Sequence, residues 1–336
     1  MRLKNCASEF PIPPFPNLSI ILNLPLDNLS RSILKKVSVI TVNFNQPLVT
    51  EQFLSSVFRE NTYSPIEIIV VDNGSKNDHT KEWQAKFNDV IYLRSEKNLG
   101  FAGGNNLGIA RATGDYLFFV NNDTEFTPGL IKKLADILDE NPKAGIVSPK
   151  ICYFDEPNKI QYAGFTEMNF NTGRNKCMGQ YEIDKGQFDN STGPTGYAHG
   201  AAMMVRKDAI DKAGPMPENF FLYYEEMDWC EKIKRCGYEI WVEPKATIYH
   251  KESISVGKKS PLKEYFMTRN RMLFIRRNAA FPSKVLFFFH FLLLVAPRNL
   301  ALYIRQKRPD LARQFLKSVW WNITHGKNSK DLGYEM

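Results

Sequence analysis

The strongest constraint on the fold is an alternation of apolar runs with helix-like segments over residues 37–123. Runs at residues 37–45, 66–75, 90–95 and 115–123 have the length of buried strands, and residues 47–59 and 76–87 have helical character. Strands and helices that alternate at this spacing build βαβ units, in which the strands pair in parallel. The sequence therefore predicts an α/β fold with a mostly parallel sheet.

Acids and amides gather where three of these apolar runs stop: Asn43 and Asn45, Asp72 and Asn73, and residues 121–123, which read Asn-Asn-Asp. Asn and Asp are common in turns, so each group alone has an ordinary explanation. However, the carboxyl ends of parallel strands lie on one edge of the sheet, which is where ligands bind. Three polar groups on one edge favour a binding site.

The composition is that of an ordinary folded protein, with 43% hydrophobic and 24% charged residues in a chain of 336. The five cysteines form no CxxC pair and have no zinc-ligand spacing, which indicates reduced thiols in a cytosolic protein. Residues 1–34 are Pro-rich and without clear periodicity, so we expect a poorly ordered extension there.

Positive charge is concentrated near the end of the chain. Residues 251–336 contain 17 lysines and arginines against 5 acids, whereas residues 1–250 contain 27 against 31. Such asymmetry indicates an anionic partner, either nucleic acid or a membrane surface. The apolar run at residues 285–296 favours the membrane, and it is too short to span a bilayer. We therefore expect no nucleic-acid partner.

Five segments carry a resemblance to a known family: VSVITVNFN, IVVDNGSKND, NLGFAGGNNLGI, FFVNNDTEFTP and FFLYYEEMDWCEKIKRCGY, in this order. Over about residues 35–280 the chain resembles a family 2 glycosyltransferase with the GT-A fold, and within that family the rhamnosyltransferase-like branch. The GxGxxG and GxxxxGK[ST] motifs of dinucleotide-binding proteins and P-loop NTPases are absent from the sequence.

The resemblance implies a Rossmann-like sheet in a catalytic domain at residues 35–260, followed by a basic, amphipathic helical region at 261–336. Residues 35–150 would bind the nucleotide sugar and residues 151–260 the acceptor. The implied reaction moves rhamnose or another hexose, with inversion, from a dTDP- or UDP-linked donor to a glycan or lipid-linked glycan in cell-surface polysaccharide synthesis. A catalytically silent sugar-nucleotide-binding protein is the alternative, since two acids of the family motifs are altered.

Asp123 is the expected metal ligand. A divalent cation such as Mn²⁺ or Mg²⁺ prefers carboxylate oxygens and offsets charge on a leaving diphosphate. The family usually has a DxD motif here, whereas this chain has only one acid at residues 121–123. A helix cap is the structural alternative for Asp123. By resemblance, His250 joins the metal or the diphosphate, with a structural role as the alternative, and Asp72 accepts hydrogen bonds from the nucleotide base.

The other expected donor-binding residues are polar residues and glycines of the strand ends and of the Gly-rich segment at 98–105, which we interpret as a loop that approaches phosphate closely. They are Asn43, Asn45, Asn98, Gly103, Gly104, Asn105 and Asn122.

An acidic cluster at Glu225, Glu226 and Asp228 is the expected source of the catalytic base. Inverting transfer needs a carboxylate that accepts the proton of the acceptor hydroxyl, and clustered carboxylates raise one another's pKa. By resemblance the base is Glu226, where the family commonly has Asp, and Asp228 is the second candidate. An acidic helix N-terminus without catalytic function is the alternative.

Glu225, His199 and Gly200 are expected at the acceptor. Arg269 and Arg271 are candidates for contacts with phosphate, or else solvated residues of a basic helix. We expect the protein to attach peripherally to the inner face of the cytoplasmic membrane through its C-terminal region.

Overall fold

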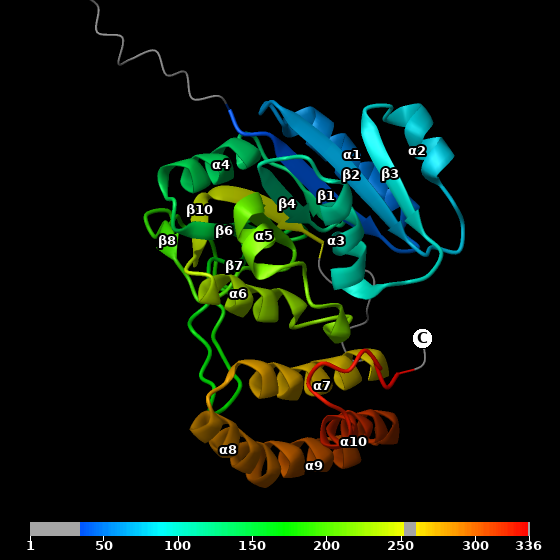
Figure 1. Cartoon of the computed structure of the whole chain (residues 1–336), viewed down its shortest axis with the longest axis vertical. Coiled ribbons are helices and arrows are strands. Elements are labelled where there is room, and N and C mark those ends of the chain that lie inside the picture. Colours follow the sequence, from blue (N-terminus) through cyan, green and yellow to red (C-terminus); the bar gives the residue numbers. More distant parts are fainter. Residues whose placement is uncertain (1–33, 252–259, 335–336) are drawn as a thin grey trace, which may run out of the picture. The chain divides into compact units, whose positions relative to one another are not determined.

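The computed structural model describes residues 34–251 and 260–334. The extension expected at residues 1–34 therefore lies almost entirely outside the described residues. One compact unit begins at Lys35 and contains both the sheet and the C-terminal helices. Figure 1 shows the sheet with its flanking helices and, beside it, the layer of helices that ends the chain.

The sheet has the strand order β3-β2-β1-β4-β9-β6-β10-β5, with β7 paired to β6 and β8 to β10. Strands β1 to β4 are parallel, β9 is antiparallel to both β4 and β6, and β6 and β10 are parallel. The bounds are β1 Val37–Asn43, β2 Ile66–Asn73, β3 Val90–Ser95, β4 Tyr116–Val120, β5 Thr124–Glu125, β6 Ala144–Tyr153, β7 Ile160–Tyr162, β8 Gly193–Pro194, β9 Ala202–Arg206 and β10 Glu239–His250. The expected mostly parallel sheet is confirmed.

Helices cover both faces of this sheet because successive strand residues point to opposite sides. Val39 and Phe118 pack with helices α1 (Pro47–Glu60), α2 (Thr80–Lys86) and α4 (Leu130–Glu140). Ile40 and Phe119 pack with α3 (Gly100–Arg111), α5 (Lys207–Ala213) and α6 (Glu225–Arg235). The parallel strands read as continuous apolar runs in the sequence because both of their faces are buried.

The C-terminal helices share the second of these cores. They are α7 (Pro261–Asn278), α8 (Phe281–His290), the π-helical turn η4 (Phe291–Val295), α9 (Ala296–Arg305) and α10 (Pro309–Thr324). Their buried side chains, among them Phe274, Phe291 and Phe315, belong to the same hydrophobic cluster as Ile40 and Trp229. The tail is therefore an integral part of the folded unit.

The prediction of a loop at residues 98–105 is wrong for residues 100–105, because these form the first half of helix α3. Its glycines let the helix lie close to the sheet. A Cβ on Gly104 would come within 2.9 Å of a Val42 methyl, and one on Gly108 within 2.4 Å of an Ile40 methyl. Asn105 is buried and donates to the Phe101 carbonyl at 2.9 Å. Gly103, Gly104 and Asn105 thus serve packing rather than a phosphate-binding loop.

The expectation about the apolar run near residue 290 also needs correction. Within the described ranges one helix, Phe281–Arg305, is 25 residues long and apolar enough to cross a membrane. The sequence prediction counted only the uninterrupted run at 285–296 and so underestimated the helix. This helix also does not expose all of its apolar side chains to solvent. Phe287, Phe291 and Val295 are buried against the protein.

Candidate active site

The polar strand ends form a connected hydrogen-bond chain on one edge of the sheet. Asn122 Nδ2 donates to Thr50 Oγ1 at 2.9 Å, and Thr50 Oγ1 donates to Asn43 Oδ1 at 3.0 Å. Asn43 Nδ2 in turn donates to Asp72 Oδ1 at 2.9 Å, and Arg94 forms an ion pair with Asp72 Oδ2. The structure therefore brings Asn43, Asp72 and Asn122 together. Sequence analysis missed Thr50 and Arg94, which have no motif of their own.

Asp72 is almost fully buried, and both of its oxygens already accept from protein donors. A carboxylate has about four acceptor positions, so it retains capacity for a ligand N–H. Its neighbourhood is held rigidly. Ser75 Oγ accepts from Asn43 Nδ2 at 3.0 Å and from the Asn45 backbone N–H at 2.8 Å, and Asn45 Oδ1 accepts from the Lys76 N–H.

Asn98 lies beside the end of β2. Its Oδ1 accepts from Asn73 Nδ2 at 3.2 Å and from the Gly100 N–H at 2.9 Å, so it ties the strand end to the start of α3. Asn73 Oδ1 accepts from the Leu99 N–H at 3.0 Å. These side chains fix the backbone around the edge on which Asp72 lies.

Asp123 and His250 face each other where the chain leaves β4 and where β10 ends. His250 Nε2 lies 3.2 Å from Asp123 Oδ1, and His250 Nδ1 lies 2.8 Å from Gln161 Oε1. Because Gln161 Oε1 can only accept, Nδ1 carries a hydrogen in this contact. Nε2 faces a carboxylate oxygen, so a cation between the two atoms, either a proton or a metal ion, stabilises this contact.

A divalent cation fits this pair of atoms. Asp123 Oδ1 is buried and accepts no hydrogen bond from the described residues. Two octahedral ligands at about 2.1 Å from a metal lie about 3 Å apart, close to the separation found here. A metal-binding histidine usually donates its other N–H to a fixed acceptor, as Gln161 provides. The described residues contain no group of three or more metal-binding side chains, so Asp123 and His250 would leave room for diphosphate and water ligands.

Glu226 lies in the first turn of α6 beside Gly200. A Cβ on Gly200 would lie 3.7 Å from Cγ of Glu226, so the glycine leaves space next to the carboxylate. Burial raises the pKa of Glu226 to about 7. Burial, followed by repulsion from Glu226, raises the pKa of Glu225 well above its usual value. One carboxyl of this pair is thus poised to exchange a proton near neutral pH.

Asp228 is held in a different way. It is fully buried, and Arg277 donates to its two oxygens from Nε at 2.9 Å and from Nη2 at 3.0 Å. Asn278 Nδ2 adds a third donor at 2.7 Å. This bidentate ion pair fastens α6 to α7, and both Asp228 oxygens are occupied by protein donors. The geometry favours Glu226 over Asp228 as the base.

His199 connects the metal pair with the acidic pair. Its ring centroid lies 6.3 Å from that of His250, and the next residue, Gly200, lies near Glu226, whose Cγ would be 3.7 Å from a Cβ added to the glycine. His199 Nδ1 accepts from the Ala201 N–H at 3.1 Å. Burial, with a smaller contribution from His250, lowers the pKa of His199 to about 3, so the ring is neutral. The two candidate centres therefore lie on either side of a single dipeptide.

The segment before Glu225 has a strained backbone. Phe221, Tyr223 and Tyr224 all have positive φ angles, of 67°, 71° and 72°. Left-handed conformations cost a non-glycine residue about 1–2 kcal/mol each. Asn270, fully buried on α7, compensates with Nδ2 contacts of 2.9, 2.8 and 2.9 Å to the carbonyls of residues 220, 222 and 223. Asn270 is thus a positioning residue that sequence analysis passed over in favour of its arginine neighbours.

We expect Asn270→Ala to lower kcat for sugar transfer with little change in the donor KM, because the segment that carries Glu225 and Glu226 loses its clamp. Stability should fall by about 1–3 kcal/mol through the unpaired carbonyls. Asn322→Ala is the matched control, since this buried asparagine also donates to backbone carbonyls. Steady-state kinetics well below the melting temperature should separate the variants. Equal kcat losses in both would assign Asn270 to general stability.

The two arginines proposed as phosphate ligands have different surroundings. Arg269 is fully buried, stacks over the Trp321 ring at 3.8 Å and donates to the Asn219 carbonyl. It is neither solvated nor able to reach a ligand, so the structure contradicts both interpretations for this residue. Arg271 is partly exposed and donates from Nε to the Tyr224 hydroxyl at 3.1 Å.

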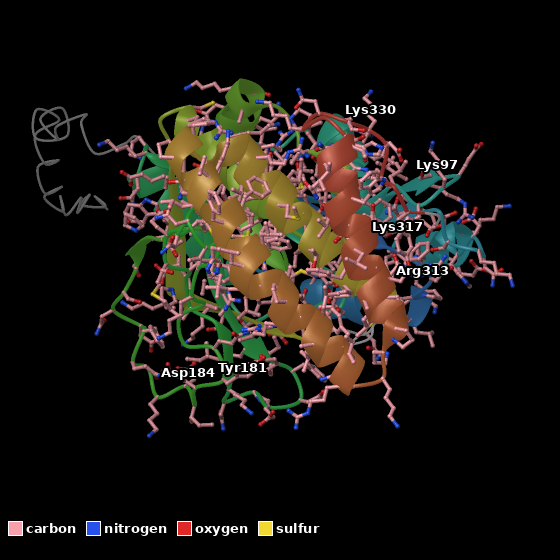
Figure 2. The ribbon with its side chains drawn as sticks, turned by 90° about the horizontal axis from the view of Figure 1, so that it is seen from below. Lys97, Tyr181, Asp184, Arg313, Lys317 and Lys330 are labelled. Carbon is pink, nitrogen blue, oxygen red and sulfur yellow. The ribbon has the colours of Figure 1, made fainter. Side chains whose placement is uncertain are left out.

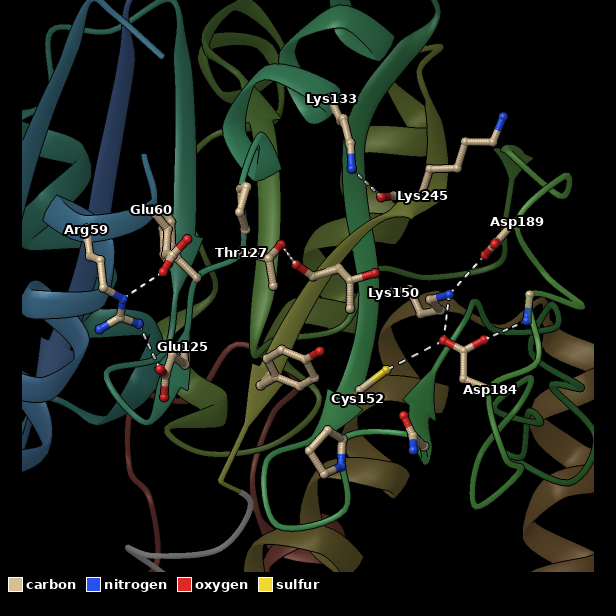
Figure 3. Close-up of a pocket in the computed structure, with 17 residues that line it drawn as sticks. Arg59, Glu60, Glu125, Thr127, Lys133, Lys150, Cys152, Asp184, Asp189 and Lys245 are labelled. Atoms are coloured by element: carbon tan, nitrogen blue, oxygen red, sulfur yellow. Dashed lines mark hydrogen bonds and ion pairs between the residues drawn. The ribbon is translucent and has the colours of Figure 1, made fainter. Parts of the chain in front are cut away.

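A cavity of about 660 Å³ opens on the other side of the sheet edge (Figure 3). Thr127, Lys150, Cys152 and Tyr249 are among the residues that line it, and Asp184 and Asp189 bind the Lys150 ammonium there. None of the site residues expected from the sequence lines this cavity. Tyr249 and His250 are neighbours on β10 and so point to opposite faces. The cavity is therefore distinct from the candidate site.

The comparison with protein families gives a clear match. The family described as Glycosyl transferase family 2 matches residues 38–214, which is more than half of the chain. N-acetylglucosaminyl-diphospho-decaprenol L-rhamnosyltransferase of Mycobacterium tuberculosis is 24% identical over 66% of this chain and 77% of its own. The dTDP-rhamnosyl transferase of Shigella flexneri is 25% identical over 72% of this chain and 80% of its own.

Solved structures confirm the GT-A fold expected from the sequence. GalNAc-T7 with UDP, GalNAc and Mn²⁺ aligns with a TM-score of 0.61 at 15% identity, over 87% of this chain and 56% of that one. A mannosyltransferase of Pyrobaculum calidifontis with GDP-Man and Mn²⁺ aligns with a TM-score of 0.52 at 14% identity, over 87% and 88%.

Proposed function

We propose, from the premise that the chain belongs to glycosyl transferase family 2, that it transfers one sugar with inversion from a nucleotide sugar to a glycan or lipid-linked glycan. The protein is a glycosyltransferase, and its relatives include rhamnosyltransferases. We infer dTDP-rhamnose as the first candidate donor and UDP-hexoses as the second. Cell-surface polysaccharide synthesis is the process that such a reaction serves.

One observation carries this proposal: His199 and Gly200 join the Asp123–His250 pair to Glu226. Inverting transfer requires a base on the acceptor side of the anomeric carbon and a stabilised leaving group on the other side. Glu226 is the candidate base, and the Asp123–His250 pair lies on the diphosphate side. The dipeptide His199–Gly200 lies between them, so the arrangement fits this requirement. Asp72, with Asn43, Asn122 and Asn98 around it, would hold the nucleoside portion of the donor.

The proposed reaction is a single displacement. The Glu226 carboxylate accepts the proton of the acceptor hydroxyl while that oxygen forms a bond to the anomeric carbon. The bond from this carbon to the phosphate oxygen breaks at the same time, and the nucleoside diphosphate leaves with the bonding electron pair. Asp123 and His250 would hold a divalent cation, Mn²⁺ or Mg²⁺, which supplies charge neutralisation for the leaving diphosphate. Glu225, His199 and Gly200 would contact the acceptor.

We also propose that the protein attaches peripherally to the inner face of the cytoplasmic membrane and that its acceptor is lipid-linked. The concentration of basic residues beyond position 250 supports this, as does the similarity to N-acetylglucosaminyl-diphospho-decaprenol L-rhamnosyltransferase, whose name includes a lipid diphosphate. We propose no nucleic-acid partner for the protein.

The test is a donor panel with Mn²⁺, in which nucleoside diphosphate release is measured for dTDP-rhamnose, UDP-glucose, UDP-N-acetylglucosamine and GDP-mannose. We expect dTDP-rhamnose to give the highest kcat/KM and the product to have inverted anomeric configuration by NMR. Ligand binding to the native state also raises apparent stability, so a thermal shift reports donor binding independently of turnover. Binding of every donor without release from any of them would contradict the proposed reaction.

A further inference from the structure

We propose that α8, η4 and α9, together with α10, form an in-plane docking face for a bilayer that contains anionic lipid. This inference deepens the proposed membrane attachment and rests on it. We define the docking face by its exposed apolar side chains on two neighbouring stretches of helix: Phe281, Val285, Leu286, Phe289, Leu292, Leu293, Leu294, Leu302, Ile304, Leu316, Trp320 and Ile323.

The density of exposed apolar side chains in this region is unusual. Twelve of the eighteen large hydrophobic residues that are exposed in the described part of the chain belong to the docking face. Leu292 and Leu293 each expose 65% of their surface, and Trp320 exposes 63%. Contiguous exposed apolar surface on a folded protein indicates a partner, because water contact with it is costly.

The helix Phe281–Arg305, called the long helix below, is buried on the side opposite to the docking face. Phe287, Phe291, Val295 and Tyr303 have at most 6% of their surface exposed. Their spacings of four, four and eight residues would drift around a regular α-helix by about 160°. The π-helical turn Phe291–Val295 takes up much of this drift because it adds a residue to one turn. The helix therefore keeps one face on the protein and offers the other to a partner.

Helix α10 extends this face sideways. Phe315 on its inner side stacks on Phe291 at 5.8 Å and contacts Tyr303 at 6.2 Å, which places α10 against the preceding helix. Its outer side bears Leu316, Trp320 and Ile323, at spacings of four and three residues. Figure 2, seen from the side of these helices, shows the long helix and α10 both turned toward the viewer.

Basic residues surround the docking face. Residues 281–334 contain nine lysines and arginines and two acids, Asp310 and Asp331. Arg313 and Lys317 lie exposed on α10, and Arg298, Arg305 and Lys307 lie exposed on and just after α9. Apolar side chains with basic residues around them are suited to a bilayer with anionic headgroups. Each basic residue near such a surface adds roughly 1 kcal/mol to the binding free energy. This charge pattern identifies a lipid surface as the occupant.

Contacts between α7 and α10 decide how the long helix meets the membrane. Asn322 Nδ2 donates to the Arg269 carbonyl at 3.0 Å, and Arg276 Nη2 donates to the His325 carbonyl at 2.8 Å. These helices come directly before and after Phe281–Arg305. If that helix crossed a bilayer, its ends would lie about 30 Å apart on opposite sides, and α10 could reach α7 only by re-entering the bilayer with its charged side chains Asp310, Arg313 and Lys317. The helix consequently lies in the plane of the interface.

The docking face is also joined to the acceptor half of the catalytic domain. Phe170 stacks on Phe274 of α7 at 6.0 Å, and a Cβ on Gly173 would lie 2.7 Å from the Phe287 ring. Phe170 and Gly173 belong to a hairpin with the antiparallel bridges Phe165–Cys177 and Asn169–Arg174, and Figure 1 shows it reaching from the sheet toward α8. A bilayer on the docking face would thus lie near the part of the protein that binds the acceptor.

The first test is co-sedimentation of the full-length protein with vesicles of phosphatidylcholine, with and without phosphatidylglycerol. We expect binding that requires phosphatidylglycerol and weakens with salt. Leu292→Gln and Leu293→Gln should each raise the dissociation constant about tenfold through lost apolar burial. The charge variant Arg313→Gln/Lys317→Gln should reduce the salt dependence. Ile183→Gln, at an exposed isoleucine outside this face, is the control and should bind normally.

The second test distinguishes an in-plane helix from a spanning one. A protease added outside sealed vesicles should remove a C-terminal tag from the bound protein, whereas a spanning helix would protect it. Donor hydrolysis without vesicles should remain normal in the Leu292 and Leu293 variants, which separates this inference from the proposed reaction. A protected tag, or a wild-type dimer that these substitutions dissociate without altering vesicle binding, would overturn the in-plane face.

Discussion

Glu226→Gln should lower the rate of sugar transfer by about 10² to 10⁴ while donor binding persists. The substitution keeps the size of the side chain and its space beside Gly200, but an amide cannot accept the hydroxyl proton. Donor affinity measured by calorimetry should stay within about twofold, because Asp72 and its partners are untouched. Single-turnover transfer to an acceptor measures the chemical step directly.

Asp228→Asn provides the contrast to this variant. In the wild type, the Asp228 carboxylate accepts hydrogen bonds from Arg277 and Asn278. Its removal leaves Arg277 without a charged partner, so the free energy of unfolding should fall by about 3–5 kcal/mol. The surviving folded protein should retain the pH dependence of the wild type. A larger loss of single-turnover rate in folded Asp228→Asn than in Glu226→Gln would reassign the base to Asp228.

The pH profile gives an independent check on the base. Burial raises the pKa of Glu226 to about 7, so the carboxyl is protonated and inactive below that pH. We expect kcat/KM to fall about tenfold per pH unit on the acid side and to level off above about pH 7. The apparent pKa belongs to the Glu225–Glu226 pair as a whole. Glu226→Gln should flatten this limb of the profile.

Asp123→Ala should abolish metal-dependent donor binding and reduce turnover on the order of 10³-fold, since a bound cation supplies several kcal/mol of charge stabilisation. Mn²⁺ binding followed by electron paramagnetic resonance tests the site without any turnover. His250→Gln should weaken Mn²⁺ as well, but less, because the carboxylate charge remains. Activity of the wild type that survives both EDTA and Asp123→Ala would remove the metal from the reaction.

Glu125→Ala is the matched control for Asp123→Ala. This carboxylate follows Asp123 by two residues, but it lines the separate cavity and pairs with Arg59. Its removal should leave both Mn²⁺ affinity and turnover unchanged. A loss equal to that of Asp123→Ala would attribute both effects to the fold of this turn.

Much of the nucleotide half of the fold follows from the sequence by simple physical rules. Strands buried on both faces produce continuous apolar runs, and parallel pairing brings their polar ends to one edge. The sequence therefore predicts that Asn43, Asp72 and Asn122 lie on the same edge of the sheet. The hydrogen-bond chain that joins them passes through Thr50, a residue of helix α1 with no distinguishing pattern.

Other parts of the site escaped prediction because they depend on contacts between distant segments. The glycines at residues 100–108 indicate a loop by local propensity, yet contact with Val42 and Ile40 makes them favourable in a helix. Asn270 lies in a helix of mixed polarity, and its partners are carbonyls about 50 residues away. The docking face was predicted only in part, because a run of apolar residues does not indicate which side of a helix is buried.

The dependence of α7 on α10 also orders events during synthesis of the chain. Arg269 and Asn270 are neighbours on α7, and Arg269 is covered by Trp321 and bonded by Asn322. Since a chain is translated from its N-terminus, the sheet can form before α10, which covers α7, leaves the ribosome. Helix α7 would thus remain uncovered until α10 has been synthesised. A stop codon before Trp321 should therefore leave the buried Arg269 of α7 without its cover.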